Sequence, residues 1–196
     1  HRRSIAAFET VAHGDLSVLV KVGVQFGLFG GAILHLGTER HHEAYLADLV
    51  AGRLLGCFAM TEHGHGSNVA ALGTVATFDP ATDEFVITTS AEDAFKDYIG
   101  NAARHAEMAV VFAQLDVPGE DGEVQRQGVH AFVARIRDGG QLVAGVRIAD
   151  DGRKMGLNGV DNGRIWFDGL RIPRENLLNR FADVSPRGST PARSTR

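Results

Sequence analysis

The sequence predicts an α+β fold in which helices come first and an antiparallel β-barrel or sandwich follows. Apolar residues recur at near-helical spacing up to about residue 55. The pattern then changes to about six short apolar runs, separated by turn residues. Short strands with turn signals between them are typical of an antiparallel barrel or sandwich. We therefore expect a helical part at 1–55, a β-part at 56–180 and a disordered tail at 181–196.

The bulk composition is that of an ordinary soluble domain. The 196 residues are 44% hydrophobic and 22% charged, and the net charge is −4. That charge provides no basic field for nucleic acid, so we expect no nucleic-acid partner. The single cysteine, Cys57, excludes an internal disulfide framework, and its apolar surroundings indicate a buried, inert thiol. No secretory leader is visible, which favours a cytosolic or organellar protein.

One apolar run in the helical part is about long enough to cross a bilayer. It covers residues 16–37, but Lys21, Gln25 and His35 interrupt it and several glycines punctuate it. A helix that is apolar all round is more often buried in a protein. We therefore expect a helix packed against other protein segments and no membrane partner.

Local signals set the boundaries of the expected helices. Asp15 and Thr38 each precede an apolar periodic run, which is where capping side chains are preferred. Gly56 follows the last such run and is expected to end the final helix. A further helix is expected to begin at Pro173, with Glu175 in its first turn.

The β-part begins with two short strands on either side of the turn "DPATDE". Asp79 followed by Pro80 is a strong turn signal, because proline fixes the backbone for the second turn position. The other expected strands are residues 108–115, 128–136, 145–149 and 163–173. After residue 180 the chain lacks apolar anchors, which is why we expect disorder there.

The stretch "GCFAMTEHGHGSN" ends an apolar run in a loop with unusual chemistry. His63 and His65 alternate and could share a face, but only His105 and His130 remain as nearby ligands and no metal motif is matched. Ser67 lies on no strand-turn-helix elbow, so a nucleophile is not indicated. A phosphate loop would need a lysine that is absent. We expect no metal and no nucleophile here.

A flat, partly polar ligand suits this loop better. Thr61 offers a hydroxyl and a backbone N–H at a strand end, while Gly64 and Gly66 allow close backbone approach. Ser67 and Asn68 add donors for a phosphate or carbonyl oxygen. The stretch "FKDYIGNAA" has a similar character, and the two loops could clamp a ring between them. From the residues alone, two ordinary turns remain the simpler interpretation.

Several blocks, read in order, resemble one family. They are "CFAMTEHGHGSNV", "KDYIGNAA", "VVFAQL", "GVHAFV" and "KMGLNGVDNGRIWFDGLRIPRENLLN". Together they resemble the acyl-CoA oxidase branch of the acyl-CoA dehydrogenase superfamily, over roughly residues 15–183. Dehydrogenases resemble "TEPGAGSD" in the first block, where this chain has His63, His65 and Asn68 instead of proline, a small residue and aspartate. The last block favours the oxidase branch.

The resemblance implies a fold of three parts with FAD held among them. An N-terminal helical domain precedes a middle β-barrel, and a C-terminal helical bundle, absent from this chain, would follow. In the first loop, Met60 and Thr61 would lie at the flavin ring, with Thr61 hydrogen-bonded near the hydride-accepting nitrogen. Gly66 would lie by the cofactor phosphates, and Ser67 by the acyl-CoA substrate.

The second loop would meet the same ring through Tyr98, Ile99 and Gly100. Relatives often have two tryptophans before the isoleucine, where this chain has Asp97 and Tyr98. The implied partners are a fatty acyl-CoA and oxygen, and full-length relatives are expected to form homodimers. The implied location is cytoplasmic in a bacterium and peroxisomal in a eukaryote.

The implied reaction is α,β-desaturation of a fatty acyl-CoA, as in fatty acid β-oxidation. A carboxylate takes the α-proton, the β-hydrogen leaves as hydride to the flavin, and oxygen is reduced to hydrogen peroxide. In this family the base belongs to the C-terminal bundle, so no catalytic residue is assigned in this chain and Glu62 is given a structural role. The alternatives are a dehydrogenase that uses an electron-transfer flavoprotein, and a non-catalytic binding module.

Overall fold

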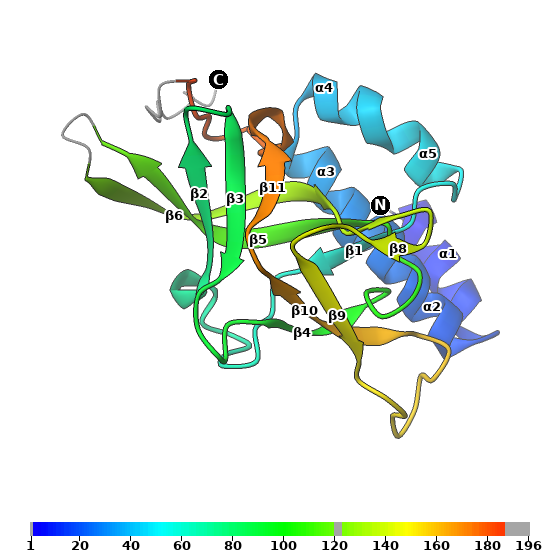
Figure 1. The fold of residues 1–196 in the computed structure, drawn as a ribbon. Coiled ribbons are helices and arrows are strands. Elements are labelled where there is room, and N and C mark those ends of the chain that lie inside the picture. Colours follow the sequence, from blue (N-terminus) through cyan, green and yellow to red (C-terminus); the bar gives the residue numbers. More distant parts are fainter. Residues whose placement is uncertain (1, 120–122, 187–196) are drawn as a thin grey trace.

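In the computed structural model, which describes residues 2–119 and 123–186, helices gather on one side of a set of curled β-sheets (Figure 1). The helical part comprises α1 (Arg2–Ala12), α2 (Leu16–Val22), the π-helix η1 (Gly23–Phe29), α3 (Gly30–Leu36), α4 (Glu39–His41), the π-helix η2 (His42–Leu46) and α5 (Ala47–Val50). The strands are β1 (Gly56–Ala59), β2 (Thr74–Asp79), β3 (Glu84–Thr89), β4 (Lys96–Gly100), β5 (Met108–Pro118), β6 (Val124–Arg135), β7 (Arg137–Asp138), β8 (Gln141–Leu142), β9 (Val146–Asp150), β10 (Asn162–Phe167) and β11 (Leu170–Pro173). Helices followed by strands confirm the α+β class.

The expected helix caps are present, but the expected stop is not. The Asp15 carboxylate accepts hydrogen bonds from the backbone N–H groups of Ser17 and Val18, at 2.7 and 3.0 Å. Thr38 forms a capping box with the His41 side chain. The last helix ends earlier than expected, at Val50, and Gly56 instead begins β1.

Strand β5 lies at the centre of the larger sheet, whose order is β1-β5-β2-β3-β11 with β6 also paired to β5. β1 and β2 both run parallel to β5, while β6 runs antiparallel to it. The expectation of an antiparallel barrel is therefore wrong at these two pairs, and the sheet is mixed. Parallel pairs need a long crossover, which the chain between β1 and β5 provides. A strand pattern in the sequence does not specify such a partner.

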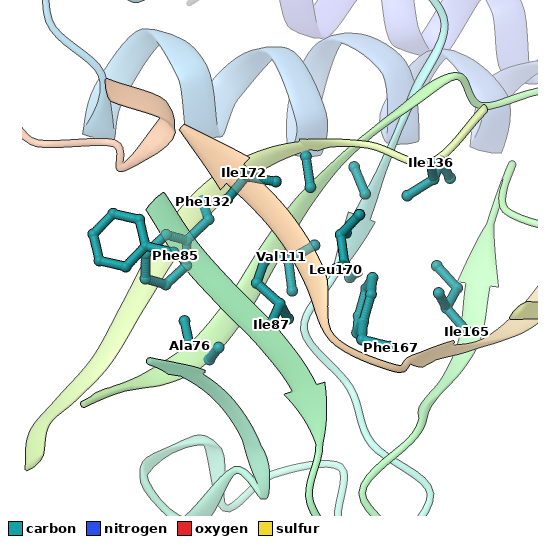
Figure 2. Packing of buried hydrophobic residues seen from close by; sticks show 14 of the residues in the cluster. Ala76, Phe85, Ile87, Val111, Phe132, Ile136, Ile165, Phe167, Leu170 and Ile172 are labelled. Carbon is teal, nitrogen blue, oxygen red and sulfur yellow. The ribbon is translucent and has the colours of Figure 1, made fainter. Parts of the chain in front are cut away.

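The inner faces of the sheets enclose one apolar core. A three-stranded sheet has the order β4-β10-β9, and its β10 side chains point toward those of the larger sheet (Figure 2). The Phe85 and Phe132 rings meet edge to face, with centroids 5.0 Å apart. Figure 2 labels Ala76, Phe85, Ile87, Val111, Phe132, Ile136, Ile165, Phe167, Leu170 and Ile172 in this cluster.

Strand β5 is buried on both faces, because the helices cover the side that the core leaves open. Val111 and Leu115 belong to the core between the sheets, whereas Val110 and Phe112 pack with Phe29 and other helix residues. This alternation follows from the two-residue period of a strand. The helical part is thereby fixed to the back of β5, next to β1 and the loop that follows it.

The apolar helix of residues 16–36, which we expect to pack against other protein segments, is buried over only part of its surface. Leu16–Leu36 is long and apolar enough to cross a membrane by length and composition, and 28% of its most apolar window is buried. One such helix is weak support for a membrane span, since a helix of a soluble protein can pass the same test. Its exposed apolar side chains are Leu16, Val18, Phe26, Leu28 and Leu34.

The C-terminal part contains less helix than the sequence predicts, and part of the predicted disordered tail is ordered. The helix expected from Pro173 is a single 3₁₀ turn, Arg174–Asn176, because Leu177 turns to extended backbone and bridges to Phe132. In the tail expected at 181–196, Val184 is only 1% exposed and joins the core. Residues 187–196 of that tail lie outside the described residues.

Replacing Gly56 by alanine should destabilise the fold. A Cβ at this position would lie 2.2 to 2.4 Å from ring atoms of Phe29, inside the contact between β1 and η1. Such overpacking costs about 1–3 kcal/mol. We expect urea denaturation of Gly56→Ala to show that loss at an unchanged denaturant slope.

The matched control is Gly27→Ala, where a Cβ would meet nothing within 4 Å. That substitution should be neutral or stabilise the helix by about 0.5–1 kcal/mol. Equal unfolding free energies for the two variants would contradict the packing of Phe29 over β1.

Candidate functional site

The structure brings the two candidate loops side by side. The Asp97 N–H donates to the Thr61 carbonyl at 3.0 Å, and the His63 N–H donates to the Phe95 carbonyl at the same distance. An antiparallel bridge joins Glu62 to Lys96 between these two bonds. The residues that follow β1 therefore pair with the beginning of β4. Nothing in the sequence spacing required this contact.

A buried ion pair fixes this junction. The Lys96 ammonium lies 2.9 Å from the Glu62 carboxylate, and their side chains are 0% and 1% exposed. Lys96 also donates to the carbonyls of Met60 and Phe112, at 3.2 and 2.7 Å. The loop after β1, strand β4 and strand β5 are thus tied together by one ammonium group.

The Glu62 carboxylate is surrounded by donors. It accepts hydrogen bonds from the Gly73 N–H at 2.7 Å, and from the Thr74 N–H and hydroxyl at 2.9 and 2.6 Å. Burial opposes ionisation of Glu62, but Lys96 and these donors outweigh it and lower its pKa below the ordinary value. Burial lowers the pKa of Lys96 to about 8 against the opposing effect of Glu62. A carboxylate so enclosed acts as a structural anchor.

Tyr98 occupies an irregular position in β4. The register with β10 shifts between Gly163 and Ile165, so that Asp97 and Tyr98 together face a single residue of β10, as in a β-bulge. Tyr98 has φ of 62°, in the left-handed region, which costs a non-glycine residue about 1–2 kcal/mol. Tyr98 is 64% exposed although Lys96, two residues earlier, is fully buried.

His63 heads a row of stacked rings. Its Nδ1 lies 2.7 Å from an Asp97 carboxylate oxygen, and its ring stacks on Phe95 with centroids 4.8 Å apart. Phe95 stacks in turn on Trp166 at 4.7 Å, and the Arg147 guanidinium lies 3.7 Å above the Trp166 ring. Sequence reasoning missed this row, because its members come from four separate segments.

The residues expected in the first loop are divided between buried and exposed positions. Thr61 is half-buried, and its hydroxyl forms no hydrogen bond with any described residue. Met60 is half-buried and packs with the cluster beneath the helices. Gly66 and Ser67 are exposed, and a Cβ at Gly66 would meet nothing within 4 Å. The open space around Gly66 leaves its backbone accessible.

In the second loop, Tyr98 is the one expected residue whose side chain reaches the surface. Ile99 is 4% exposed and packs in the core between the sheets, so it can meet a ligand only through its backbone. A Cβ on Gly100 would lie 3.0 Å from a methyl of Val24 in η1, so close packing against the helix favours glycine there.

The helical part is attached next to this loop through Asp161. Its carboxylate accepts from the Lys21 ammonium of α2 at 2.7 Å and from the Arg104 N–H at 2.8 Å, and it lies 2.6 Å from Nδ1 of His105. Burial opposes ionisation of Asp161, but the Lys21 and His105 hydrogen bonds lower its pKa to about 2. Lys21 also donates to Asn101, directly after β4.

Other chemistry considered from the sequence finds little support in the geometry. In the part of the chain that the structure describes, no group of three or more His, Cys, Asp or Glu side chains is arranged to hold a metal ion. Cys57 is fully buried, and burial raises the pKa of its thiol to about 12, as expected of an inert residue.

Comparisons with known proteins agree on one family. Residues 57–170 match the family described as "Acyl-CoA dehydrogenase, middle domain". The chain is 56% identical over 187 residues to the peroxisomal acyl-coenzyme A oxidase 3 of Arabidopsis thaliana, covering 95% of this chain and 27% of that protein. The chain therefore spans about a quarter of the length of the relatives that it matches.

Solved structures show the same fold. Acyl-CoA oxidase 3 of Yarrowia lipolytica superposes with a TM-score of 0.84 at 42% identity, covering 91% of this chain and 26% of that one. Acyl-CoA oxidase-2 of Caenorhabditis elegans, in a structure bound with FAD, ascaroside-CoA and ATP, gives 0.83 at 31% identity, with 89% and 26% covered.

Breaking the buried ion pair should cost far more stability than breaking an exposed one. Lys96→Met leaves the Glu62 carboxylate buried without its cation, which typically costs about 3–5 kcal/mol. The control Arg53→Met removes an exposed pair with Asp48 and should cost about 1 kcal/mol or less. Adding Glu62→Gln to Lys96→Met should recover part of the loss in urea denaturation. Equal effects of Lys96→Met and Arg53→Met would refute the anchoring role.

Acid should weaken the attachment of α2 through Asp161. The folded-state pKa of about 2 lies below the usual 3.8, so the folded state binds fewer protons between these values and loses stability as pH falls through them. The loss should reach about 2 kcal/mol by about pH 2. Asp161→Asn should lack this part of the acid dependence in urea denaturation, whereas the exposed control Asp138→Asn should retain it. Parallel pH profiles for wild type and Asp161→Asn would contradict it.

Proposed function

The chain belongs to the acyl-CoA dehydrogenase family, and from this we propose that it forms the flavin-facing part of an FAD-dependent acyl-CoA oxidase. One observation carries the proposal: the loop after β1 and the bulged strand β4 lie side by side, with a free Thr61 hydroxyl and an exposed Tyr98 ring. A hydroxyl and an aromatic ring on neighbouring segments suit a flat heterocycle with hydrogen-bonding atoms on its edge.

The residues present fit such a cofactor in kind. Thr61 can donate to an acceptor on the ring edge, and Tyr98 can stack on the ring face. Gly66 leaves backbone accessible for a phosphate oxygen, and the Ser67 hydroxyl can donate to the acyl-CoA. Met60, Ile99 and Gly100 contribute backbone and shape rather than exposed side chains. When bound, FAD accepts the hydride from the acyl-CoA and passes its electrons to oxygen, giving hydrogen peroxide.

We place the proton-abstracting base outside this chain. Glu62 is the glutamate nearest to the first loop, yet its carboxylate is buried and accepts from Gly73, Thr74 and Lys96. The lowered pKa favours the ionised form of Glu62. The enclosing donors, however, leave its carboxylate no open path to a substrate carbon. The C-terminal helical bundle of the family is the proposed source of the base.

The proposed partners follow from the same family assignment. A fatty acyl-CoA is the substrate and oxygen the electron acceptor, in fatty acid β-oxidation, and the full-length protein is a homodimer. A peroxisomal location is proposed for a eukaryotic source and a cytoplasmic one for a bacterial source; the Arabidopsis thaliana relative carries the word "peroxisomal" in its name. The enclosure of Glu62 favours a second candidate, a flavin-binding module with no turnover of its own.

The isolated chain should produce no measurable hydrogen peroxide from palmitoyl-CoA with added FAD. A general base typically contributes about 10²–10⁴-fold to the rate, and the Glu62 carboxylate is enclosed by its donors. A longer version that restores the length of the relatives should produce peroxide. A longer version without activity would favour the non-catalytic module.

The matched variant for this assay is Glu62→Gln. In the longer protein it should lower the free energy of unfolding, since Glu62 anchors β4. The pH dependence of turnover should stay the same, because Glu62 is not the base. Peroxide formation by the short chain at the rate of the longer one, abolished by Glu62→Gln, would place the base at Glu62 and refute our assignment.

A further inference from the structure

We infer that Asp97 and Asn162 are positioning residues that hold the Tyr98 ring outward as a platform for a bound planar ring. The inference deepens the proposed function and rests on it for the identity of that ring, an isoalloxazine. The positioning itself rests only on contacts within this chain. Neither residue was among the expected site residues, and neither needs to touch the ligand.

The outward direction of Tyr98 depends on its backbone conformation. In a regular strand, successive side chains point to opposite faces, and a one-residue shift exchanges the faces. Lys96 and Tyr98 are two residues apart and would share a face in a regular strand, yet Lys96 is fully buried whereas Tyr98 is 64% exposed. Its φ of 62° at the bulge produces this arrangement. A relaxation of φ to the ordinary extended region would redirect the ring.

Both backbone groups of Tyr98 are held by side chains. The Tyr98 N–H donates to one Asp97 carboxylate oxygen at 2.8 Å. The Tyr98 carbonyl accepts from the Asn162 side-chain amide, also at 2.8 Å. These two hydrogen bonds restrain the peptide groups on both sides of the left-handed residue. They replace the ladder bonds that the bulge interrupts.

The two restraining side chains are themselves held in place. The second Asp97 oxygen lies 2.7 Å from Nδ1 of His63, in the loop after β1. The Asn162 side-chain oxygen accepts from the Lys154 ammonium at 2.5 Å. The Asp97 side chain is 5% exposed, so solvent competes little for its hydrogen bonds. Tyr98 is therefore restrained from two directions by groups with fixed orientations.

Asp97 also links the segment that carries Tyr98 to the segment that carries Thr61. Its backbone N–H donates to the Thr61 carbonyl at 3.0 Å, so one residue contacts both Thr61 and Tyr98. The free hydroxyl of Thr61 and the exposed ring of Tyr98 are thus held on neighbouring segments. A planar ring that stacks on Tyr98 with a polar edge toward Thr61 matches this arrangement.

The first experiment tests the positioning without any ligand. Backbone chemical shifts and three-bond couplings of the unliganded chain report φ of Tyr98. Asp97→Ala and Asn162→Ala should each release Tyr98 from the left-handed region. Asp97→Asn should preserve it, because the amide oxygen still accepts from the Tyr98 N–H while the amide nitrogen faces His63. The exposed Asp138→Ala is the control. Retention of positive φ in both Asp97→Ala and Asn162→Ala would overturn the inference.

The second experiment measures FAD fluorescence during titration with each variant. Wild type, Asp97→Asn and Tyr98→Phe should quench FAD strongly. Asp97→Ala and Tyr98→Leu should raise the dissociation constant about 3- to 10-fold, the size of one aromatic pair contact. They should also leave bound FAD brighter at saturation, which a mere loss of stability would not produce.

The two measurements separate failure of the inference from failure of the proposed function. Wild-type quenching by both Asp97→Ala and Tyr98→Leu would overturn the platform role. If wild type binds no FAD while φ of Tyr98 changes as expected in Asp97→Ala and Asn162→Ala, the flavin assignment is refuted. The planar ring would then not be an isoalloxazine. The positioning role of Asp97 and Asn162 would then still stand on the first measurement.

Discussion

The arrangement of the candidate site depends on one fully buried ammonium group. Lys96 is fully buried, and it neutralises Glu62 while it donates to carbonyls of Met60 and Phe112. A buried charge is tolerated only when it is paired and its hydrogen bonds are satisfied. The pair therefore admits few alternative arrangements of the loop after β1, of β4 and of β5. Thr61 directly precedes Glu62, and Tyr98 follows Lys96 by two residues.

Next to that pair, strand β5 separates the core between the sheets from the helical part of the chain. One face of β5 packs in the core between the sheets and the other against the helices. The same strand supplies the Phe112 carbonyl to Lys96. Packing on both faces leaves β5 little freedom to shift, since protein interiors are close-packed. The candidate site thus lies at the edge of a rigid element, although its exposed groups belong to loops and a bulge.

The sequence predicted local features well and long-range contacts poorly. The caps at Asp15 and Thr38 and the strands on either side of the Asp79 turn were visible because neighbouring residues determine them. The parallel pairing of β1 with β5 was not, because a strand pattern is silent about its partner. The loop residues themselves indicated Thr61, and the family resemblance added Tyr98 as a candidate.

The family resemblance did not predict which side chains hold those candidate residues in place. A lysine in an apolar stretch gives no sign that it is fully buried, and Lys96 was not expected to be. The contact between His63 and Asp97 joins residues that are distant in sequence. The left-handed backbone of Tyr98 could not be predicted either, because that position is not a glycine. Such features can be recognised only when tertiary contacts are known, because the partner that stabilises each of them lies elsewhere in the sequence.

The parallel pairing of β1 also has a consequence for the order of assembly. Gly56–Ala59 finds its sheet partner only in Met108–Val111, after three intervening strands. Contacts between residues so far apart in sequence raise the contact order, and loop closure must precede them. During synthesis the loop after β1 therefore emerges long before the strands that shape it. Its contacts with β4 and β5 can form only after those strands have left the ribosome.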